Sequence, residues 1–333
     1  MAAPKSSIRS VAVALAGNAF VTLTKFAAFL ASGSGAMLSE AIHSVADTGN
    51  QVLLFWGLKR ASRESDEDFH YGYGGERFVF GMLSASGIFF VGAGVTIYHG
   101  IAGLVEPHMP HLTLMTFVVL GLSLLVEGSV LLYAVKLVNA QRGQTPFLKY
   151  VREQAEPATL AILLEDSAAV FGLFLAAAGI FASYMTQLPV WDSLASILVG
   201  LVLAAVALFI IHENRELLLG KSVPDGVEQQ FVEILRSRAS IRDVHDVKTR
   251  QLTPEAFKFK AEIVFNESFL AEQLERVLPQ DGTALSSPAR TKTLRELSHS
   301  AVNVIAREID LIEDAIRTAI PQAKHIDLEV HHN

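Results

Sequence analysis

Two segments carry ionisable side chains inside otherwise apolar stretches of the chain. The first contains His43 and Asp47, and the second contains the adjacent pair Glu165 and Asp166. His43 and Asp47 are four residues apart, a spacing that places both side chains on one face of a helix. Imidazole and carboxylate groups are ligands that suit Zn²⁺, and also Mn²⁺ and Fe²⁺. We therefore predict a divalent-metal site formed by His43, Asp47 and Asp166, with Glu165 as a further candidate ligand.

Asp47 and Asp166 lie at similar depths in two predicted membrane spans. Asp47 is eleven residues inside a span that begins at position 36, and Asp166 is nine residues inside one that begins at 157. At 1.5 Å per residue these depths are about 16 and about 14 Å, close to the middle of a bilayer core about 30 Å thick. Buried hydrogen bonding between helices is an alternative, but ionisable groups at this depth are usually functional. A single site shared by the two spans would explain why Asp47 and Asp166 lie at similar depths.

Three further acidic groups have roles that the sequence leaves open. Adjacent helical residues point about 100° apart, so we expect only one of Glu165 and Asp166 to face the metal directly. The other is then a supporting partner, a protonated carboxyl or part of a proton path. Glu40, three residues before His43, either lines the metal exit or caps its helix. Glu127 either belongs to a proton path or pairs two helices.

The composition is that of a membrane protein. Hydrophobic residues make up 51% of the 333 residues and charged residues only 18%, against about 25% in a typical soluble domain. A membrane-spanning helix needs about 20 mostly apolar residues. Six stretches meet that requirement, at 10–32, 36–58, 78–103, 112–135, 157–183 and 190–212.

The distribution of basic residues predicts the orientation of these six spans. Lys and Arg occur before the first span, after the sixth and in two of the five connections, whereas the other three connections contain none. The positive-inside rule then places both termini in the cytoplasm. We expect no cleaved signal peptide, and the short N-terminus suits a bacterial inner membrane, with an organelle membrane as the alternative. The net charge of −7 gives no indication of nucleic-acid binding, and the absence of cysteine excludes disulfides and thiolate metal sites.

The composition changes at about residue 221. We therefore predict a transmembrane transport domain at 1–221 and a cytoplasmic domain at 222–333. The second domain is expected to be α+β, of the ferredoxin-like type, because helical and alternating patterns follow one another in it. The expected elements are a helix at 227–238, strands at 244–251 and 257–265, a loop at 279–290, a helix at 291–318 with apolar positions from Leu294 to Ile312, and a strand at 325–331.

Four motifs resemble those of the cation diffusion facilitator family, whose members are divalent-metal/proton antiporters. The resemblance covers nearly the whole chain and rests on Ser39–Asp47, Tyr71–Arg77, Asp192–Ser196 and Val244–Arg250. It implies efflux of divalent cations, most of all Zn²⁺, by proton-coupled alternating access in the lipid bilayer. It also implies a homodimer, no tightly bound cofactor and no enzymatic activity.

The sequence departs from the family pattern at two sites. Ile162 occupies the position where the fifth span usually carries a histidine, so one of four expected ligands is missing unless Glu165 or water substitutes for it. In the soluble domain, His245 and His331 match positions that bind extra metal in some relatives, whereas Ala261 and Asn333 replace two others. A weak cytoplasmic metal site at His245 and His331 and a pair of ordinary exposed histidines therefore both stay open.

Three functions other than zinc efflux are compatible with parts of the sequence. The first is an Mn²⁺ or Fe²⁺ transporter with the same fold. The second is a non-transporting membrane scaffold, which the missing fifth-span histidine keeps open. The third is an intramembrane metalloprotease, which would need a His-Glu-x-x-His pair that the sequence lacks. A phosphate-binding glycine-lysine motif is also missing, so proton exchange is expected to drive transport in place of ATP.

Overall fold

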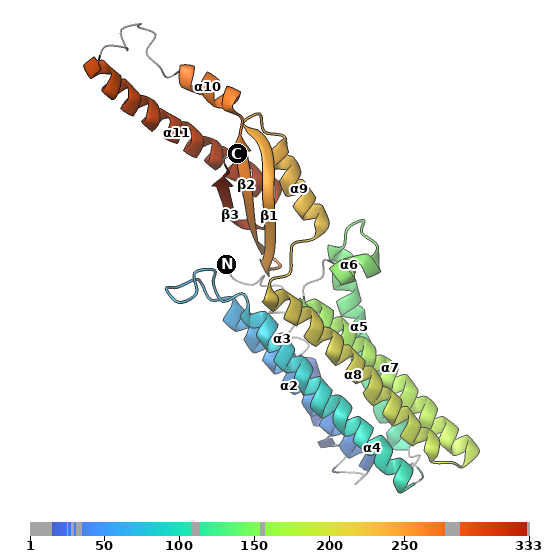
Figure 1. Cartoon of the computed structure of the whole chain (residues 1–333). Helices are drawn as coiled ribbons and strands as arrows, with labels where there is room; N and C mark the ends of the chain where they lie inside the picture. Colours follow the sequence, from blue (N-terminus) through green and yellow to red (C-terminus); the bar gives the residue numbers. More distant parts are fainter. Residues whose placement is uncertain are drawn as a thin grey trace. The chain divides into compact units, whose positions relative to one another are not determined.

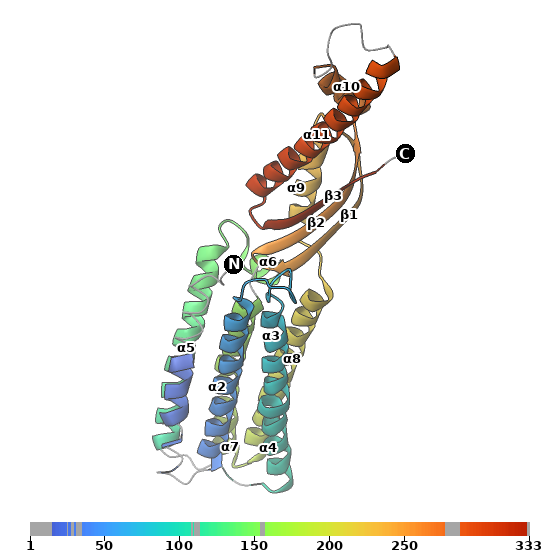
Figure 2. The same cartoon turned by 90° about the vertical axis from the view of Figure 1, so that its left-hand side faces the viewer.

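The computed structural model describes residues 15–24, 26–27, 30, 35–107, 109, 114–153, 157–276 and 287–331. Its contacts divide the chain into two compact units, Met1–Leu219 and Gly220–Asn333. The first unit is helical, and the second combines helices with a small sheet (Figures 1 and 2).

Long helices that run side by side make up the first unit (Figure 2). A short helix at Leu15–Thr24 precedes them. The π-helical turn η1 joins α3 and α4 into one continuous rod of 30 residues. The labelled elements are α2 (Gly35–Ala61), α3 (Glu76–Gly87), η1 (Ile88–Ala93), α4 (Gly94–Val105), α5 (Leu114–Gln141), α6 (Phe147–Glu153), α7 (Pro157–Thr186) and α8 (Val190–Leu219).

Four helices in the described part of the chain are long and apolar enough to cross a membrane, by length and composition. They are Glu76–Val105, Leu120–Gln141, Thr159–Thr186 and Val190–Leu219. This is the pattern of a multi-pass membrane protein. α2 has 27 residues but carries the polar side chains of Asp47, Asn50 and Gln51, and the predicted first span is described as a helix only over Leu15–Thr24. The count of six spans therefore stays a prediction.

Small residues bring α4 and α8 into close contact. A Cβ atom added to Gly100 would lie 2.9 Å from the carbonyl oxygen of Ser193. In the reverse direction, a Cβ atom on Gly200 would lie 3.1 Å from the carbonyl oxygen of Ala93. Glycine permits such close approach of two helix backbones inside a membrane. The start of α8 is also fixed on α7, because the amide of Asp192 donates a hydrogen bond of 3.1 Å to Ser183 Oγ.

The loop between α2 and α3 is held together around Asp66. One carboxylate oxygen accepts a hydrogen bond of 2.6 Å from the Tyr73 hydroxyl, and the other accepts from the amides of Asp68 and Phe69. The guanidinium of Arg63 lies 4.2 Å from the centre of the Tyr73 ring. The hydrogen bond from Tyr73 lowers the pKa of Asp66 and raises the pKa of Tyr73. The Tyr71–Arg77 motif therefore forms an ordered connection between two helices.

The second unit contains a three-stranded sheet with helices. Its strand order is β1-β2-β3; β1 is antiparallel to β2, and β2 is parallel to β3. In a four-stranded split β-α-β-β-α-β arrangement the last strand is separated from the third by the first strand. The described residues contain no such first strand, so β3 pairs directly with β2. The elements are α9 (Asp225–Arg236), β1 (Ile241–Thr253), β2 (Ala256–Phe265), α10 (Glu267–Glu275), α11 (Ser287–Ala319) and β3 (Ala323–Val330).

The core of this unit lies between the sheet and its helices. The rings of Phe231 on α9 and Phe259 on β2 stack with their centroids 4.6 Å apart, and both are fully buried. Ile312 and Ile316 on α11 are buried against the same cluster. The apolar face predicted for this helix is buried only in its second half, because Leu294 remains 53% exposed.

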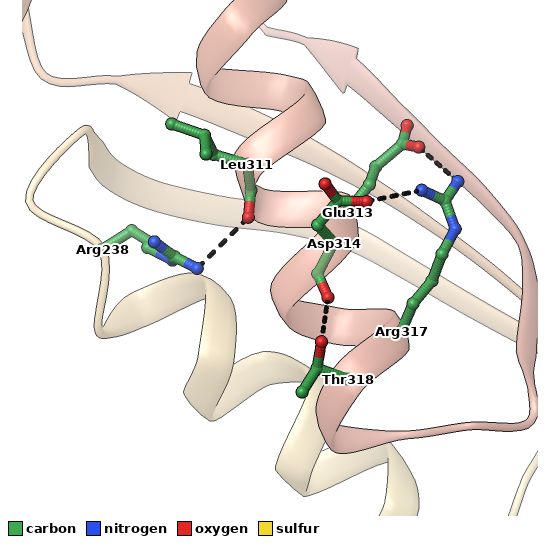
Figure 3. A network of polar contacts seen from close by, with 6 residues as sticks. All are labelled: Arg238, Leu311, Glu313, Asp314, Arg317 and Thr318. Atoms are coloured by element: carbon green, nitrogen blue, oxygen red, sulfur yellow. Dashed lines mark hydrogen bonds and ion pairs between the residues drawn. The ribbon is translucent and has the colours of Figure 1, made fainter.

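Polar contacts fix the buried half of α11 (Figure 3). Arg238, just after α9, donates a hydrogen bond of 3.3 Å to the carbonyl oxygen of Leu311. The guanidinium of Arg317 contacts Glu313 at 2.6 Å and Asp314 at 3.3 Å along the helix surface. The first of these contacts joins the two helices that cover the sheet, and the others are exposed pairs that contribute little to stability.

The Val244–Arg250 motif lies on β1 and holds the beginning of the unit against the sheet. Thr249 Oγ1 donates a hydrogen bond of 2.9 Å to Glu228 on α9 and accepts one of 3.3 Å from the amide of Val223. Asp246 adopts a φ of 46° where the pairing of β1 with β2 is irregular, and its carboxylate binds Lys248 at 2.7 Å. The described contacts of Thr249 and Asp246 are therefore structural.

Candidate metal site

Acidic side chains from three helices, α2, α5 and α7, are brought together in the first unit. Glu165 and Asp166 on α7 are buried, with 6% and 7% of their surfaces exposed. The charge of Asp47 on α2 interacts with both of them, and the charge of Glu127 on α5 interacts with Asp166. The predicted site residues Asp47, Glu165 and Asp166 therefore lie in one neighbourhood, and Glu127 lies at its edge.

Two oxygens in this cluster have no hydrogen-bond partner within the described part of the chain. They are Glu165 Oε1 and Asp166 Oδ2, both fully buried. Buried polar atoms are nearly always paired, and neighbouring carboxylates in an apolar environment repel one another. A divalent cation would bind these oxygens and offset the repulsion. The cluster is thus chemically suited to a hard or borderline cation with oxygen ligands.

Both acids of the Glu165–Asp166 pair interact with Asp47, although helix geometry predicts that only one faces the metal. Asn50 also belongs to this neighbourhood, and the sequence reasoning missed it. Its side chain is buried and lies next to Glu165. The available signal was its position three residues after Asp47 and seven after His43, on the same helix face. Asn50 also packs closely on the α3 backbone, since a Cβ atom at Gly87 would lie 2.8 Å from Asn50 Oδ1.

The remaining predicted ligands on α2 cannot be placed in the cluster. The side chains of His43 and Glu40 lie outside the described residues, although both positions belong to α2. Among the side chains that are described, no three His, Asp or Glu residues lie close enough to hold an ion. The ligand set therefore stays a prediction, and the described carboxylates are its oxygen-rich part.

A cavity of about 120 Å³ adjoins the cluster. Residues of α2, η1, α4, α5, α7 and α8 line it. Its lining includes Ala46, the neighbour of Asp47, and residues of α7 between Ala168 and Ala176, which span about 12 Å of that helix. Its polar lining includes Glu127 and also His99, which the sequence reasoning missed. A histidine inside an apolar span was the available signal.

The second unit brings His245 and His331 side by side. Their ring centroids are 5.5 Å apart. His331 Nδ1 lies 2.8 Å from Glu262 Oε2, and His245 Nε2 lies 3.3 Å from Asp243 Oδ2. Each imidazole therefore already contacts one carboxylate. Adjacent imidazoles with two nearby acids are compatible with weak metal binding, and the predicted site at this position remains open.

Comparisons with known proteins agree on the class of the chain. The family described as the cation efflux transmembrane domain matches residues 11–219. The mitochondrial proton-coupled zinc antiporter SLC30A9 of Homo sapiens is 36% identical over 329 residues, covering 96% of this chain and 58% of the human protein. Metal tolerance protein C4 of Arabidopsis thaliana is 35% identical over 337 residues, covering 98% of this chain and 74% of the plant protein.

A more distant relative is named as a bacterial pump. The cation-efflux pump FieF of Shewanella oneidensis is 26% identical over 250 residues, which covers 74% of this chain and 77% of the pump. The present chain spans less than two thirds of the zinc antiporters that it matches, 58% of the human protein. These three relatives are named as an antiporter, a metal tolerance protein and a pump, and none of the three is named as an enzyme.

Proposed function

Since the chain belongs to the cation efflux family, the cation diffusion facilitators, we propose that it exports divalent metal cations, most of all Zn²⁺, in exchange for protons. The observation that carries this proposal is the cluster of the partly buried Asp47 with the buried Glu165 and Asp166, in which two oxygens lack partners among the described residues. Three acids in the apolar interior are costly unless positive charge compensates them. A transported cation and exchanged protons can each supply that charge.

The proposed ligands are His43, Asp47 and Asp166, with Glu165 in place of the histidine that Ile162 replaces. Burial of Glu165 next to Asp47 supports this substitution. A cation entering from the cytoplasm displaces protons from these groups, and protons from the opposite side later displace the cation. The protein alternates between conformations that open the site to one side or the other.

Two acidic residues, Glu127 and Glu40, are assigned to the pathway of protons or metal and not to the ligand set. Glu127 lines the cavity and interacts with Asp166, which supports a role in proton movement between the cavity and the site. Glu40, one helical turn before His43, is proposed to line the exit.

We assign the chain six spans, with a transport domain at 1–221 and a cytoplasmic domain at 222–333. Both termini are assigned to the side from which the metal is exported, as in a bacterial inner membrane. A relative is named as mitochondrial, so an organelle membrane is the alternative setting. The cytoplasmic domain is proposed to form a homodimer, and its adjacent His245 and His331 a weak metal site. No tightly bound cofactor is proposed.

Metal uptake into proteoliposomes tests the function directly. We expect the wild-type protein to move Zn²⁺ in response to a pH gradient. Asp47→Ala abolishes transport, and Glu165→Ala weakens it less than Asp166→Ala. Glu64→Ala, at an exposed loop carboxylate, is the matched control and leaves the flux unchanged. Wild-type flux in Asp47→Ala vesicles would refute the site.

The same proteoliposome assay distinguishes two alternative functions from this proposal by the metals that are moved. An oxygen-rich donor set favours Mn²⁺ more than a histidine-rich one does, so competition of Zn²⁺ with Mn²⁺, Fe²⁺ and Co²⁺ ranks the metals. A non-transporting scaffold, which the absence of the usual histidine at Ile162 keeps open, moves none of them.

A further inference from the structure

The cavity beside the candidate metal site lies on one side of that site. On α7, its lining residues fall between Ala168 and Ala176, beyond Asp166 in the direction of the end of the helix. On the rod of α3, η1 and α4, the lining begins at Val91 and continues to His99. None of the described residues of α3 lines this cavity. The cavity therefore extends from the site toward the end of the bundle opposite the α2–α3 loop.

On the loop side of the site, buried polar side chains lie between the helices. Ser84 Oγ on α3 donates a hydrogen bond of 3.3 Å to the carbonyl oxygen of Asn50 on α2. A Cβ atom at Gly81 would lie 2.7 Å from Asn214 Oδ1 on α8, and Asn214 Nδ2 donates to a carbonyl oxygen of its own helix at 2.8 Å. Gln51 is 1% exposed. Asn50 Nδ2 and Gln51 Oε1 have no hydrogen-bond partner among the described residues.

These polar groups do little to join the helices. Polar side chains that stabilise a membrane bundle do so by hydrogen bonding from one helix to another. Asn214 instead bonds within α8, and Asn50 and Gln51 each keep an atom without a partner in the described part of the chain. Such atoms are costly in an apolar interior, and polar side chains inside spans usually face a water-filled space. The arrangement therefore suits a second conformation in which water reaches this region.

α3 is the element whose contacts here can open. It packs between α2 and α8 (Figure 2). Its close contacts with these neighbours involve the side chains of Asn50, Phe80 and Asn214. α4 differs, because Cβ atoms at Gly100 and Gly200 would meet backbone atoms of α8 and of the rod. Side-chain contacts can separate and re-form while the backbone contact between α4 and α8 stays closed.

η1 provides the point at which α3 can move relative to α4. The amide of Gly94 donates a hydrogen bond to the carbonyl oxygen of Phe89, five residues earlier, which is the π-helical pattern. Short π-helical turns inside α-helices occur frequently at functional sites and are a recognised cause of kinks. η1 also lies beside the cavity, because Val91 and Gly92 belong to its lining. The rod thus changes its helix type between its packed part and its cavity-lining part.

We propose that α3 is the gate on the loop side of the metal site and pivots at η1, away from α2 and α8, to admit the cation. This inference rests on the proposed function, which assigns the α2–α3 loop to the cytoplasm. When α3 moves, the oxygens of Asn50, Ser84 and Asn214 face water and line the way to the carboxylates. The structure shows this gate closed, with the cavity on the release side.

The first test is the reactivity of introduced thiols. The sequence contains no cysteine, so a single introduced cysteine is the only thiol in the protein. Ser84→Cys and Asn214→Cys are treated with a charged, membrane-impermeant thiol reagent in vesicles whose outer face carries the α2–α3 loop. A thiol reacts as its thiolate, which forms in water and not in an apolar interior. We expect both variants to react several-fold faster than Ala207→Cys, the matched control. Ala207 is fully buried on the same helix as Asn214 and packs with Ile88 at the pivot.

The second test locks the gate. A Cβ atom at Gly81 would lie 3.0 Å from Asn214 Cγ, so the Gly81→Cys/Asn214→Cys pair is close enough to form a disulfide. Oxidation of this pair should abolish zinc flux into proteoliposomes, and reduction should restore it. The control is Gly103→Cys/Ser193→Cys between α4 and α8, where the two Cβ atoms would be 3.6 Å apart. Its flux should be the same in the oxidised and reduced forms, because this contact stays closed throughout.

Each outcome separates this inference from the proposed function. Unchanged zinc flux in the oxidised Gly81→Cys/Asn214→Cys protein, with the disulfide verified by mass, overturns the gate and leaves zinc transport standing. Equal reaction rates of Ser84→Cys and Ala207→Cys also overturn it. Absence of flux in wild type refutes the proposed function. If the reduced double variant moves no zinc, the nearly isosteric Ser84→Cys decides the result, and reaction at the control rate counts against the gate.

Discussion

Replacing Gly100 by alanine tests how closely α4 and α8 pack. The added Cβ atom would lie 2.7 Å from Ile197 Cγ1, 2.9 Å from Ser193 O and 3.0 Å from Ile197 N. Ordinary contacts begin at about 3.5 Å, so the helices must separate by about 0.5 Å. Two of the three atoms belong to the backbone and cannot rotate away. Such overpacking costs about 1–3 kcal/mol.

The assay is the apparent unfolding temperature of the purified protein in detergent. For a unit of about 200 residues, 1 kcal/mol corresponds to about 2–4 °C. We therefore expect Gly100→Ala to lower the midpoint by about 2 to about 12 °C. Gly121→Ala on α5 is the control, because no heavy atom of the described residues, apart from the neighbouring backbone of α5 itself, lies within 4 Å of the added Cβ. Alanine is the better helix former, so this variant should be unchanged or more stable.

The comparison between the two alanine variants decides the result. Equal midpoints for Gly100→Ala and Gly121→Ala would show that α4 and α8 pack less closely than these distances require.

Three further predictions concern the loop and the second unit. Tyr73→Phe removes the hydrogen bond that lowers the pKa of Asp66, so amide exchange in the loop should be faster than in wild type at neutral pH. The difference is present above the ordinary aspartate pKa and disappears as the pH falls through the lowered pKa of Asp66. Phe259→Ala empties a fully buried position and should cost about 3–5 kcal/mol, measured by denaturant unfolding of the second unit in the full chain. Thr249→Val keeps the volume but removes the hydrogen bond to Glu228, and should cost about 1 kcal/mol in the same measurement.

The controls for these variants come from exposed positions. Leu294→Ala should leave the unfolding of the second unit unchanged, because that side chain is 53% exposed. An equal loss in Leu294→Ala and Phe259→Ala would contradict the assigned core. Wild-type amide exchange in Tyr73→Phe at neutral pH would show that the Asp66 hydrogen bonds do not order the loop.

Much of the fold could be predicted from apolar runs and alternation. The start of α8 at Val190 is confirmed, and the predicted helix–strand–strand–helix–strand order of the second unit is confirmed except for the additional helix α10 between β2 and α11. The predicted ends were less accurate: α8 continues to Leu219 although its apolar run ends at 212, because a helix can extend beyond the bilayer into polar sequence. α10 was missed because it has only nine residues, although Asn266 caps it by accepting hydrogen bonds from the amides of Ser268 and Phe269. The π-helical turn η1 has no compositional signal that distinguishes it from an α-helix.

The candidate site could be predicted in part for a different reason. Ionisable residues in apolar sequence are rare enough to identify Asp47 and Asp166 without a structure. Because adjacent helical residues point about 100° apart, only one of Glu165 and Asp166 was expected to face the site. That argument was less informative, because the charge of Glu165 also interacts with Asp47. Neutral Asn50 and the isolated His99 belong to no metal-ligand pattern, so their roles depend on which helices pack together. Contacts between distant segments supply that information, and local periodicity does not.

The loss of histidine at Ile162 makes charge balance the central problem of the proposed mechanism. A site rich in carboxylates carries more negative charge than one in which a neutral imidazole replaces an acid. Buried carboxylates need compensating positive charge, which a divalent cation supplies in the loaded state. After the cation departs, protons are the small cations that can enter the same space and restore the balance. Proton exchange then follows from the donor set itself.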